Sequence, residues 1–187
     1  MTYTPKSPVT LTGDVTGVGE NVITTTLNKT ISSSSSLYYY GYSTATIVLG
    51  SSATAIPLNV DVRKDSCFAH SSTTNSNKIT ISAPGWYNVK VQAIFVPAQC
   101  SNLNCCMNQQ CSCSCTGVIN LYQNNVAVVG AQALFGADDG STNDYMDAFF
   151  EVLINCATND VLSLCASVSS GNIQTVPNNI RMIIKTC

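Results

Sequence analysis

Short runs of β-forming residues, separated by turn residues, recur along most of this sequence. In residues 118–123 and 161–166, apolar side chains occupy every second position, as a strand with one buried face requires. Pro84 and Gly85 precede one run, and Asn124 and Asn125 separate two others as in a hairpin. The runs are residues 46–49, 56–62, 78–81, 87–96, 117–123, 127–134, 146–154, 160–167 and 181–186. Roughly eight or nine strands in about 150 residues, with no convincing helix, predict an all-β sandwich.

The composition predicts a neutral, hydroxyl-rich surface. The chain has 187 residues, enough for one ordinary domain with an appendage, and 45% of them are hydrophobic. Charged residues make up only 10%, so Ser, Thr, Asn and Gln must cover the surface. The net charge is −2, and the Lys and Arg residues are scattered. Without a basic stripe to neutralise phosphates, nucleic acid is not an expected partner.

The first residues lack the charged-then-apolar plan of a signal peptide, and Pro5 interrupts them. The longest apolar runs, at residues 126–135 and 148–154, are too short to cross a bilayer core of about 30 Å. We therefore expect a soluble protein made in the cytoplasm, without membrane insertion.

Two segments with different compositions divide the chain. Residues 1–36 are expected to form a β-rich attachment segment or stalk that ends in a serine linker at residues 32–36. This segment has too few large apolar side chains for a core of its own, so trimerisation or docking should order it. Residues 37–187 carry the remaining strand signals and are expected to form one β domain.

Residues 67–70, followed by residues 79–89, resemble the centre of the C1q and tumour-necrosis-factor-like jelly roll, with Gly85, Trp86 and Tyr87 at its turn into a long strand. The hairpin at 119–129, the strand at 159–164 and the closing strand at 181–185 follow in the family's order. The resemblance covers residues 42–187 and implies a jelly-roll sandwich that forms a homotrimer. The sequence departs from the family at Asn159, where Gly is usual, and in a cysteine-rich insertion.

Residues 11–17, Leu-Thr-Gly-Asp-Val-Thr-Gly, together with residues 24–27, are similar to a motif of phage tail fibres and related virion spikes. Joined to a trimeric jelly roll, this resemblance implies a structural virion protein located in the particle. It would be a head fibre or capsid decoration subunit that contacts the major capsid protein or another virion protein. The alternative is the receptor- or carbohydrate-binding tip of a tail fibre, which would use the loops at residues 70–77 and 136–145.

Ten cysteines exceed ordinary usage. Six lie close together, and three interpretations stay open for them: a zinc or iron site, local disulfides and free thiols. Their spacing lacks the paired C-x₂-C knuckles of zinc sites. The six are Cys100, Cys105, Cys106, Cys111, Cys113 and Cys115. Cys67, Cys156 and Cys165 lie in strand-like patterns, where a cysteine acts as a small hydrophobe. Cys187 is either a frayed terminal thiol or a partner of another cysteine.

The chain offers few residues for catalysis. Its single histidine, His70, borders a polar loop without a Gly-x-Ser-x-Gly elbow, so we expect a solvated loop residue and no enzyme. An acidic cluster has oxygen ligands suited to calcium, although a solvated turn is the default interpretation. It consists of Asp138, Asp139, Asp144 and Asp147. No cofactor is expected, and no residue is assigned to a catalytic or metal site.

A dense aromatic run occupies residues 38–42, Tyr-Tyr-Tyr-Gly-Tyr. Exposed tyrosines often contact sugars or proteins, because each combines apolar area with a hydroxyl group. The same run would also fit the core or the seam between subunits of a jelly-roll trimer, and we favour this structural interpretation.

Overall fold

The computed structural model describes residues 36–98, 115–137 and 145–186, together with three short strands near the amino terminus. The chain divides into two compact units, Met1–Ser35 and Ser36–Cys187. In the first unit, β2 (Val15–Gly19) pairs in antiparallel fashion with β1 (Val9–Leu11) and β3 (Thr26–Leu27). No helix among the described residues is long and apolar enough to cross a membrane.

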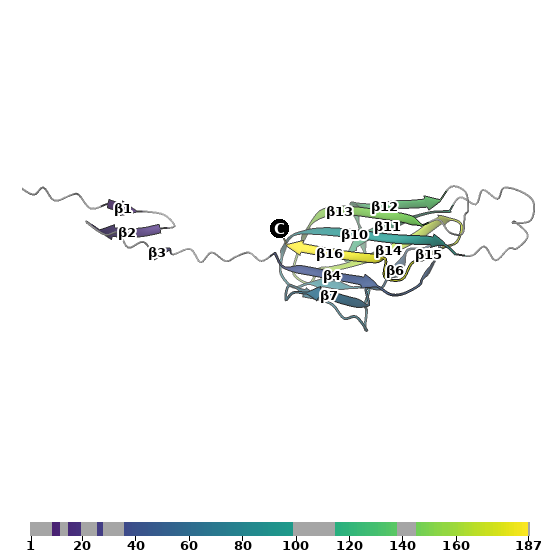
Figure 1. The fold of residues 1–187 in the computed structure, drawn as a ribbon, viewed down its shortest axis with the longest axis horizontal. Coiled ribbons are helices and arrows are strands. Elements are labelled where there is room, and N and C mark those ends of the chain that lie inside the picture. The colour runs from purple at the N-terminus through teal and green to yellow at the C-terminus, as the bar shows by residue number, and fades with distance from the viewer. Residues whose placement is uncertain are drawn as a thin grey trace, which may run out of the picture. The chain divides into compact units, whose positions relative to one another are not determined.

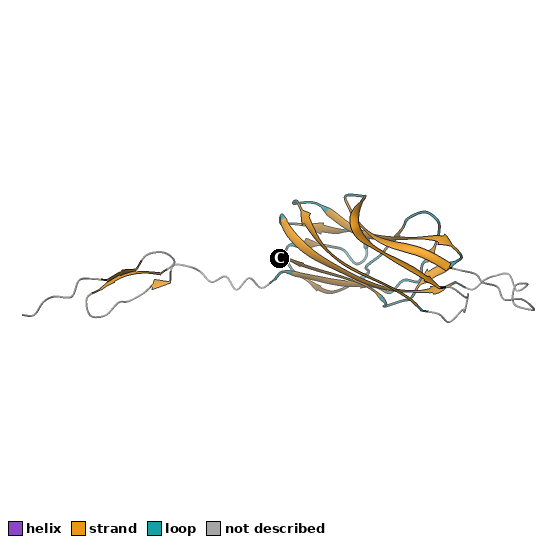
Figure 2. Cartoon of the chain, turned by 90° about the horizontal axis from the view of Figure 1, so that it is seen from above, coloured by secondary structure: helices purple, strands orange, loops and turns teal. Residues whose placement is uncertain are grey.

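The second unit is a sandwich of two antiparallel sheets, and its described residues contain strands but no helix (Figures 1 and 2). The centre of the first sheet has the order β7, β4, β16, β10, β13, and β15 with β5 extends it beside β10. These strands are β4 (Tyr38–Ser43), β5 (Val48–Leu49), β7 (Val60–Lys64), β10 (Gly85–Pro97), β13 (Met146–Cys156), β15 (Ile173–Thr175) and β16 (Ile180–Thr186).

The second sheet has the order β12, β11, β14, β9, β8, and β6 also pairs with β14. Its strands are β6 (Thr54–Ile56), β8 (Phe68–Ala69), β9 (Ile79–Ile81), β11 (Cys115–Gln123), β12 (Val126–Ala137) and β14 (Val161–Ser170). Two antiparallel sheets in this order form a jelly roll, which confirms the predicted fold class.

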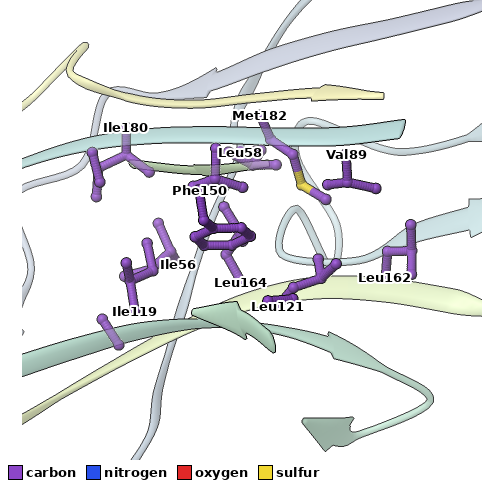
Figure 3. Close-up of a cluster of buried hydrophobic side chains, with 14 of the residues drawn as sticks. Ile56, Leu58, Val89, Ile119, Leu121, Phe150, Leu162, Leu164, Ile180 and Met182 are labelled. Atoms are coloured by element: carbon purple, nitrogen blue, oxygen red, sulfur yellow. The ribbon is translucent and has the colours of Figure 1, made fainter. Parts of the chain in front are cut away.

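The core lies between the inner faces of the two sheets (Figure 3). The predicted alternation is confirmed, because Ile119 and Leu121 of β11 and Leu162 and Leu164 of β14 are fully buried. Phe150 of β13 lies among side chains from both sheets. Burial of such apolar area is the main force that holds the two sheets together.

Some predicted strand boundaries were wrong. The run at residues 56–62 is divided between β6, which ends at Ile56, and β7, which begins at Val60. Pro57 lies between them and has no N–H for a sheet hydrogen bond, which explains the break. The tyrosine run, which was not among the predicted strands, forms β4. At the departure from the family pattern, Asn159 adopts a left-handed φ of 71°, a conformation that Asn tolerates better than most residues.

The Asp160 carboxylate connects two turns, the β11–β12 hairpin and its own turn at residues 157–160. It accepts hydrogen bonds from Gln123 Nε2 at 2.6 Å, Asn124 Nδ2 at 2.7 Å and the Ala157 amide at 2.8 Å. These bonds stabilise the charged form, so the Asn124 amide first, then the Ala157 N–H and Gln123, lower the pKa of Asp160.

We predict that Asp160→Asn lowers the free energy of unfolding by about 1–2 kcal/mol, because an amide group would face three donors. The carboxylate stabilises the fold above the ordinary pKa of Asp. This contribution is lost as the pH falls through the lowered folded value. Urea unfolding between pH 7 and pH 3 should therefore show a flatter acid dependence in D160N than in the wild type. Thr158→Ala, at an exposed position in the same turn, is the control, and an equal effect there would contradict the assignment.

Candidate functional site

The face of the first sheet that points away from the core carries an unusual density of large side chains. On β4, Tyr38, Tyr40 and Tyr42 point outward and are half-buried, while Tyr39 is fully buried. Ile183 lies outward on β16 between these tyrosines and β10, opposite Lys90. The tyrosine run therefore contributes both to the core, through one ring, and to the surface, through three.

The apolar character continues across the sheet to its far edge. Trp86 on β10 is 53% exposed, and Phe149 and Leu153 on β13 are each 54% exposed. We call this surface the outer face, defined by the outward side chains of β4, β16, β10 and β13. These are Tyr38, Tyr40, Tyr42, Arg181, Ile183, Lys185, Trp86, Asn88, Lys90, Gln92, Ile94, Asp147, Phe149, Glu151, Leu153 and Asn155. Clusters of this kind mark interaction surfaces on soluble proteins.

Two shallow hollows of about 360 and 200 Å³ lie on the outer face. Both are lined by Tyr38, Lys90 and Ile183. Glu151 and Lys185 are among the other residues that line the larger hollow, and Tyr40 and Arg181 are among those that line the smaller one. The outer face is therefore uneven enough to receive protruding side chains of a partner.

Three charged groups of the outer face, Lys90, Glu151 and Lys185, pair with one another or lie over aromatic rings. Lys90 Nζ lies 3.6 Å from Glu151 Oε2 and 5.2 Å from the centroid of the Phe149 ring. Asn88 Nδ2 donates to Glu151 Oε1 at 2.8 Å, and this bond, followed by Lys90, lowers the pKa of Glu151. Lys185 Nζ lies 5.3 Å from the centroid of the Tyr38 ring. Such cation–π contacts let a mixed face lose water with little uncompensated charge.

The neighbouring edge of the sandwich, formed by β12, also exposes apolar side chains. Val129 is 98% exposed and precedes Gly130, which has a left-handed φ of 78°. The pairing of β11 with β12 shifts register here, so the strand bulges. Val129 therefore projects from the edge beside β13, against which β12 packs.

The prediction that His70 is a solvated loop residue was wrong. Its side chain is 0% exposed, and Nδ1 lies 2.6 Å from Asp61 Oδ1. Its Nε2 lies 3.0 Å from the Ser76 carbonyl oxygen, and the Tyr39 hydroxyl donates to Asp61 Oδ1 at 3.2 Å. The sequence separates these residues widely, but the pairing of β4 with β7 brings them together.

The Tyr39 side chain extends along β4 over Gly41, and its hydroxyl group thereby reaches Asp61 and His70. A Cβ added at Gly41 would collide with the Tyr39 hydroxyl group, so glycine is required by close approach. Burial first, and the nearby Asp61 second, raise the pKa of Tyr39 far above its usual value. The phenol therefore remains a hydrogen-bond donor.

The cysteines in strand-like patterns are unpaired thiols, as predicted: Cys67 and Cys156 are buried and Cys165 is half-buried. Burial raises the pKa of Cys156 to about 11, so this thiol stays uncharged. Of the six clustered cysteines, only Cys115 lies within the described residues. It is a buried free thiol close to Gly171. Cys100, Cys105, Cys106, Cys111 and Cys113, as well as Cys187, lie outside the described residues.

The predicted calcium cluster also falls mostly outside the described residues, which include Asp147 but not Asp138, Asp139 or Asp144. Within the described part of the chain, no three His, Cys, Asp or Glu side chains are grouped to hold a metal ion. Of the two predicted binding loops, residues 70–77 are described. They border a polar hollow of about 390 Å³ lined by His70, Ser71, Thr74, Asn75 and Lys78.

Sequence reasoning identified the tyrosine run but missed the rest of the outer face and a further hollow of about 740 Å³ on the second sheet. Val118, Leu134, Phe135 and Ser167 are among the residues that line this hollow. The outer face had a detectable signal on β13, where Phe149 and Phe150 are adjacent and must point to opposite faces. A strand with bulky apolar residues on both sides needs a second covering surface.

The sequence matches no family model, and no curated protein matches it. Comparison with solved structures places the fold in the class of tumour-necrosis-factor-like jelly rolls. Murine APRIL at pH 8.5 is similar with a TM-score of 0.53 and 8% identity, over 81% of this chain and 99% of that one. Eiger TNF from S. frugiperda is similar with a TM-score of 0.52 and 9% identity, over 81% and 92%. The predicted jelly roll is thereby confirmed.

Proposed function

We propose that this chain is a structural virion protein that assembles as a homotrimer through its outer face. Residues 1–36 would attach the trimer to a phage particle, as a head fibre or decoration subunit, and the jelly roll would be exposed. The observation that carries self-association is the outer face, whose Trp86, Phe149 and Leu153 are each more than half exposed. The phage assignment depends on the resemblance of residues 11–17 to fibre motifs.

A second copy of this chain is the partner that suits the outer face best. Arg181 and Lys185 give the β16 side a positive character, and Asp147 lies on β13 at the edge, whereas Lys90 and Glu151 already pair with each other within one copy. One copy's β13 edge would therefore complement the basic side of another copy, and repeated contacts of this kind can close a ring. The low content of charged residues also limits repulsion between copies.

Two measurements test this proposal. Light scattering of the full chain should give the mass of three copies, and a monomer at micromolar concentration would refute self-association. Analysis of purified native particles should find the protein as a stoichiometric component, and labelling should place it on the head or the tail. Particles that lack the protein would refute the virion assignment while leaving the trimer unaffected.

The second candidate function is carbohydrate or host-receptor binding, favoured by the polar hollow beside residues 70–77. Hydroxyl and amide groups of Ser71, Thr74 and Asn75 surround it, and such groups are the usual hydrogen-bonding partners of sugars. We predict that a glycan bound on an array is lost with Thr74→Ala and Asn75→Gly, while the oligomeric state is unchanged. Glycan binding that survives both substitutions would place the receptor site elsewhere.

A further inference from the structure

We propose that the hollow of about 740 Å³ on the second sheet is a binding site for an uncharged sugar unit. It lies near the end of the sandwich where β11 begins and β12 ends. The outer face belongs to the first sheet, and the polar hollow beside residues 70–77 is lined by a different set of residues. The site therefore goes beyond the proposed function and does not require a trimer.

One half of the hollow is apolar and is built on a cross-strand pair. Leu134 of β12 lies directly opposite Val118 of β11, and the Leu134 side chain is 77% exposed. Gly136, two residues further along β12, has no side chain and so leaves space beside Leu134. Phe135 lies between them, is buried and stacks on Phe95 with the ring centroids 3.9 Å apart. The apolar half is therefore preformed, with a fixed ring behind two aliphatic side chains.

The other half of the hollow carries hydroxyl groups. Ser167 of β14 lies opposite Val118 on the other side of β11, and Ser51 belongs to the connection between β5 and β6. Thr116 Oγ1 lies 2.6 Å from Ser169 Oγ, so these two hydroxyl groups already bond to each other. Among the described residues, the hydroxyl groups of Ser51 and Ser167 have no such partner. These two groups can therefore form hydrogen bonds with a ligand.

The lining of the hollow, within the part of the chain that the structure describes, includes no charged side chain. A charged ligand would lose hydration there without gaining an opposite charge, which is unfavourable. A purely hydrocarbon ligand would cover the serine hydroxyl groups and leave them without hydrogen-bond partners, which also costs free energy. The ligand should therefore be uncharged, with an apolar side and a hydroxylated side.

A sugar ring has both of these sides, because its C–H groups form an apolar face and its hydroxyl groups surround the ring. The C–H face would pack on Leu134 and Val118, and hydroxyl groups at the ring edge would reach Ser167 and Ser51. The volume of the hollow lies within the range of about 300–1,000 Å³ that is typical of small-molecule sites. The apolar contact is aliphatic and the hollow is open, so a single sugar unit should bind with a dissociation constant of about 1–10 mM.

Amide NMR of the full wild-type chain tests the site with uncharged sugars. Methyl glucoside, methyl galactoside, methyl mannoside and N-acetylglucosamine are titrated separately to about 50 mM, well above the expected dissociation constant. At least one of them should shift the amide signals of Val118, Gly136 and Ser167 in a saturable manner. Cyclohexanol, a ring of similar size with one hydroxyl group, should bind at least about tenfold more weakly, because it leaves serine hydroxyl groups unpaired. No saturable shift with any sugar, shifts confined to residues 71–78, or equal binding of cyclohexanol would overturn the proposal.

Leu134→Ser and Ser167→Ala test the two halves of the hollow separately. The dissociation constant of the sugar that binds should rise at least about tenfold in L134S, which loses apolar contact, and about threefold to tenfold in S167A, which loses a hydrogen bond. Val126→Ser is the matched control, because Val126 is 69% exposed on the same strand but does not line the hollow. Sugar binding that survives both L134S and S167A, or that V126S weakens as strongly as L134S, would overturn the site. Light scattering of the same samples reports the oligomeric state, so failure of the sugar site and failure of the proposed trimer are separate results.

Discussion

Phe149→Lys is expected to convert the proposed trimer into a folded monomer. The new ammonium group would lie on the outer face beside Lys90, whose Nζ is 5.2 Å from the centroid of the present ring. In the proposed interface, this places a second positive charge where apolar area was buried, and an unpaired buried charge costs about 3–5 kcal/mol. The dissociation constant should therefore rise at least about a hundredfold. Sedimentation or light scattering across a concentration series measures the change.

Ala55→Lys is the matched control for this substitution. Ala55 is exposed on β6 of the second sheet and pairs with Cys165. The control introduces the same charge on a strand, but on the opposite side of the sandwich. The trimer should survive A55K and dissociate in F149K. Trimers in both variants would show that the outer face is not the contact surface.

The sheets were predictable because their signals are local. Alternation in β11 and β14 depends only on which residues face the core, so it can be read directly from residues 118–123 and 161–166. The turn at Gly85, where β10 begins, could likewise be predicted from neighbouring residues alone. The break at Pro57 was also visible, since proline lacks the donor that a continuous strand would need. Strand existence was therefore predictable, whereas exact boundaries depended on pairing partners.

The His70 cluster could not be predicted, because its parts are distant in the sequence. Tyr39, Asp61 and His70 meet only after β4 pairs with β7 and the loop folds back. Seen alone, a histidine among Ser, Thr and Asn residues suggests a solvated loop. The surrounding composition could not reveal that Asp61 would lie within hydrogen-bond distance of its ring and give its buried nitrogen a partner.

The outer face could be predicted from the sequence only in part. The tyrosine run was recognised as either surface or core, and strand alternation resolves this by placing Tyr39 inward and its neighbours outward. The contributions of Ile183 and Phe149 needed the sheet order, since β16 and β13 flank β10 from opposite sides. A binding surface spread over four strands is a property of topology and has no linear motif.

Phe150→Ala should have the second large effect, on stability instead of assembly. Phe150 is adjacent to Phe149 but points inward, is 6% exposed and lies among side chains of both sheets (Figure 3). Removing the ring leaves a cavity and is expected to lower the free energy of unfolding by about 3–5 kcal/mol.

The measurement uses the Phe149→Lys background, in which the proposed trimer contact is removed, because dissociation of that trimer would otherwise contribute to the apparent stability. In urea unfolding, the free energy of unfolding of F149K/F150A should be lower than that of F149K by about 3–5 kcal/mol. Leu153→Ala in the same background is the control on the same strand, and its exposed position predicts a change below about 1 kcal/mol. A large loss at Leu153 with none at Phe150 would reverse the assignment of the inner and outer faces of β13. The residues of β13 assigned to the core and those assigned to the proposed trimer contact would then both be wrong.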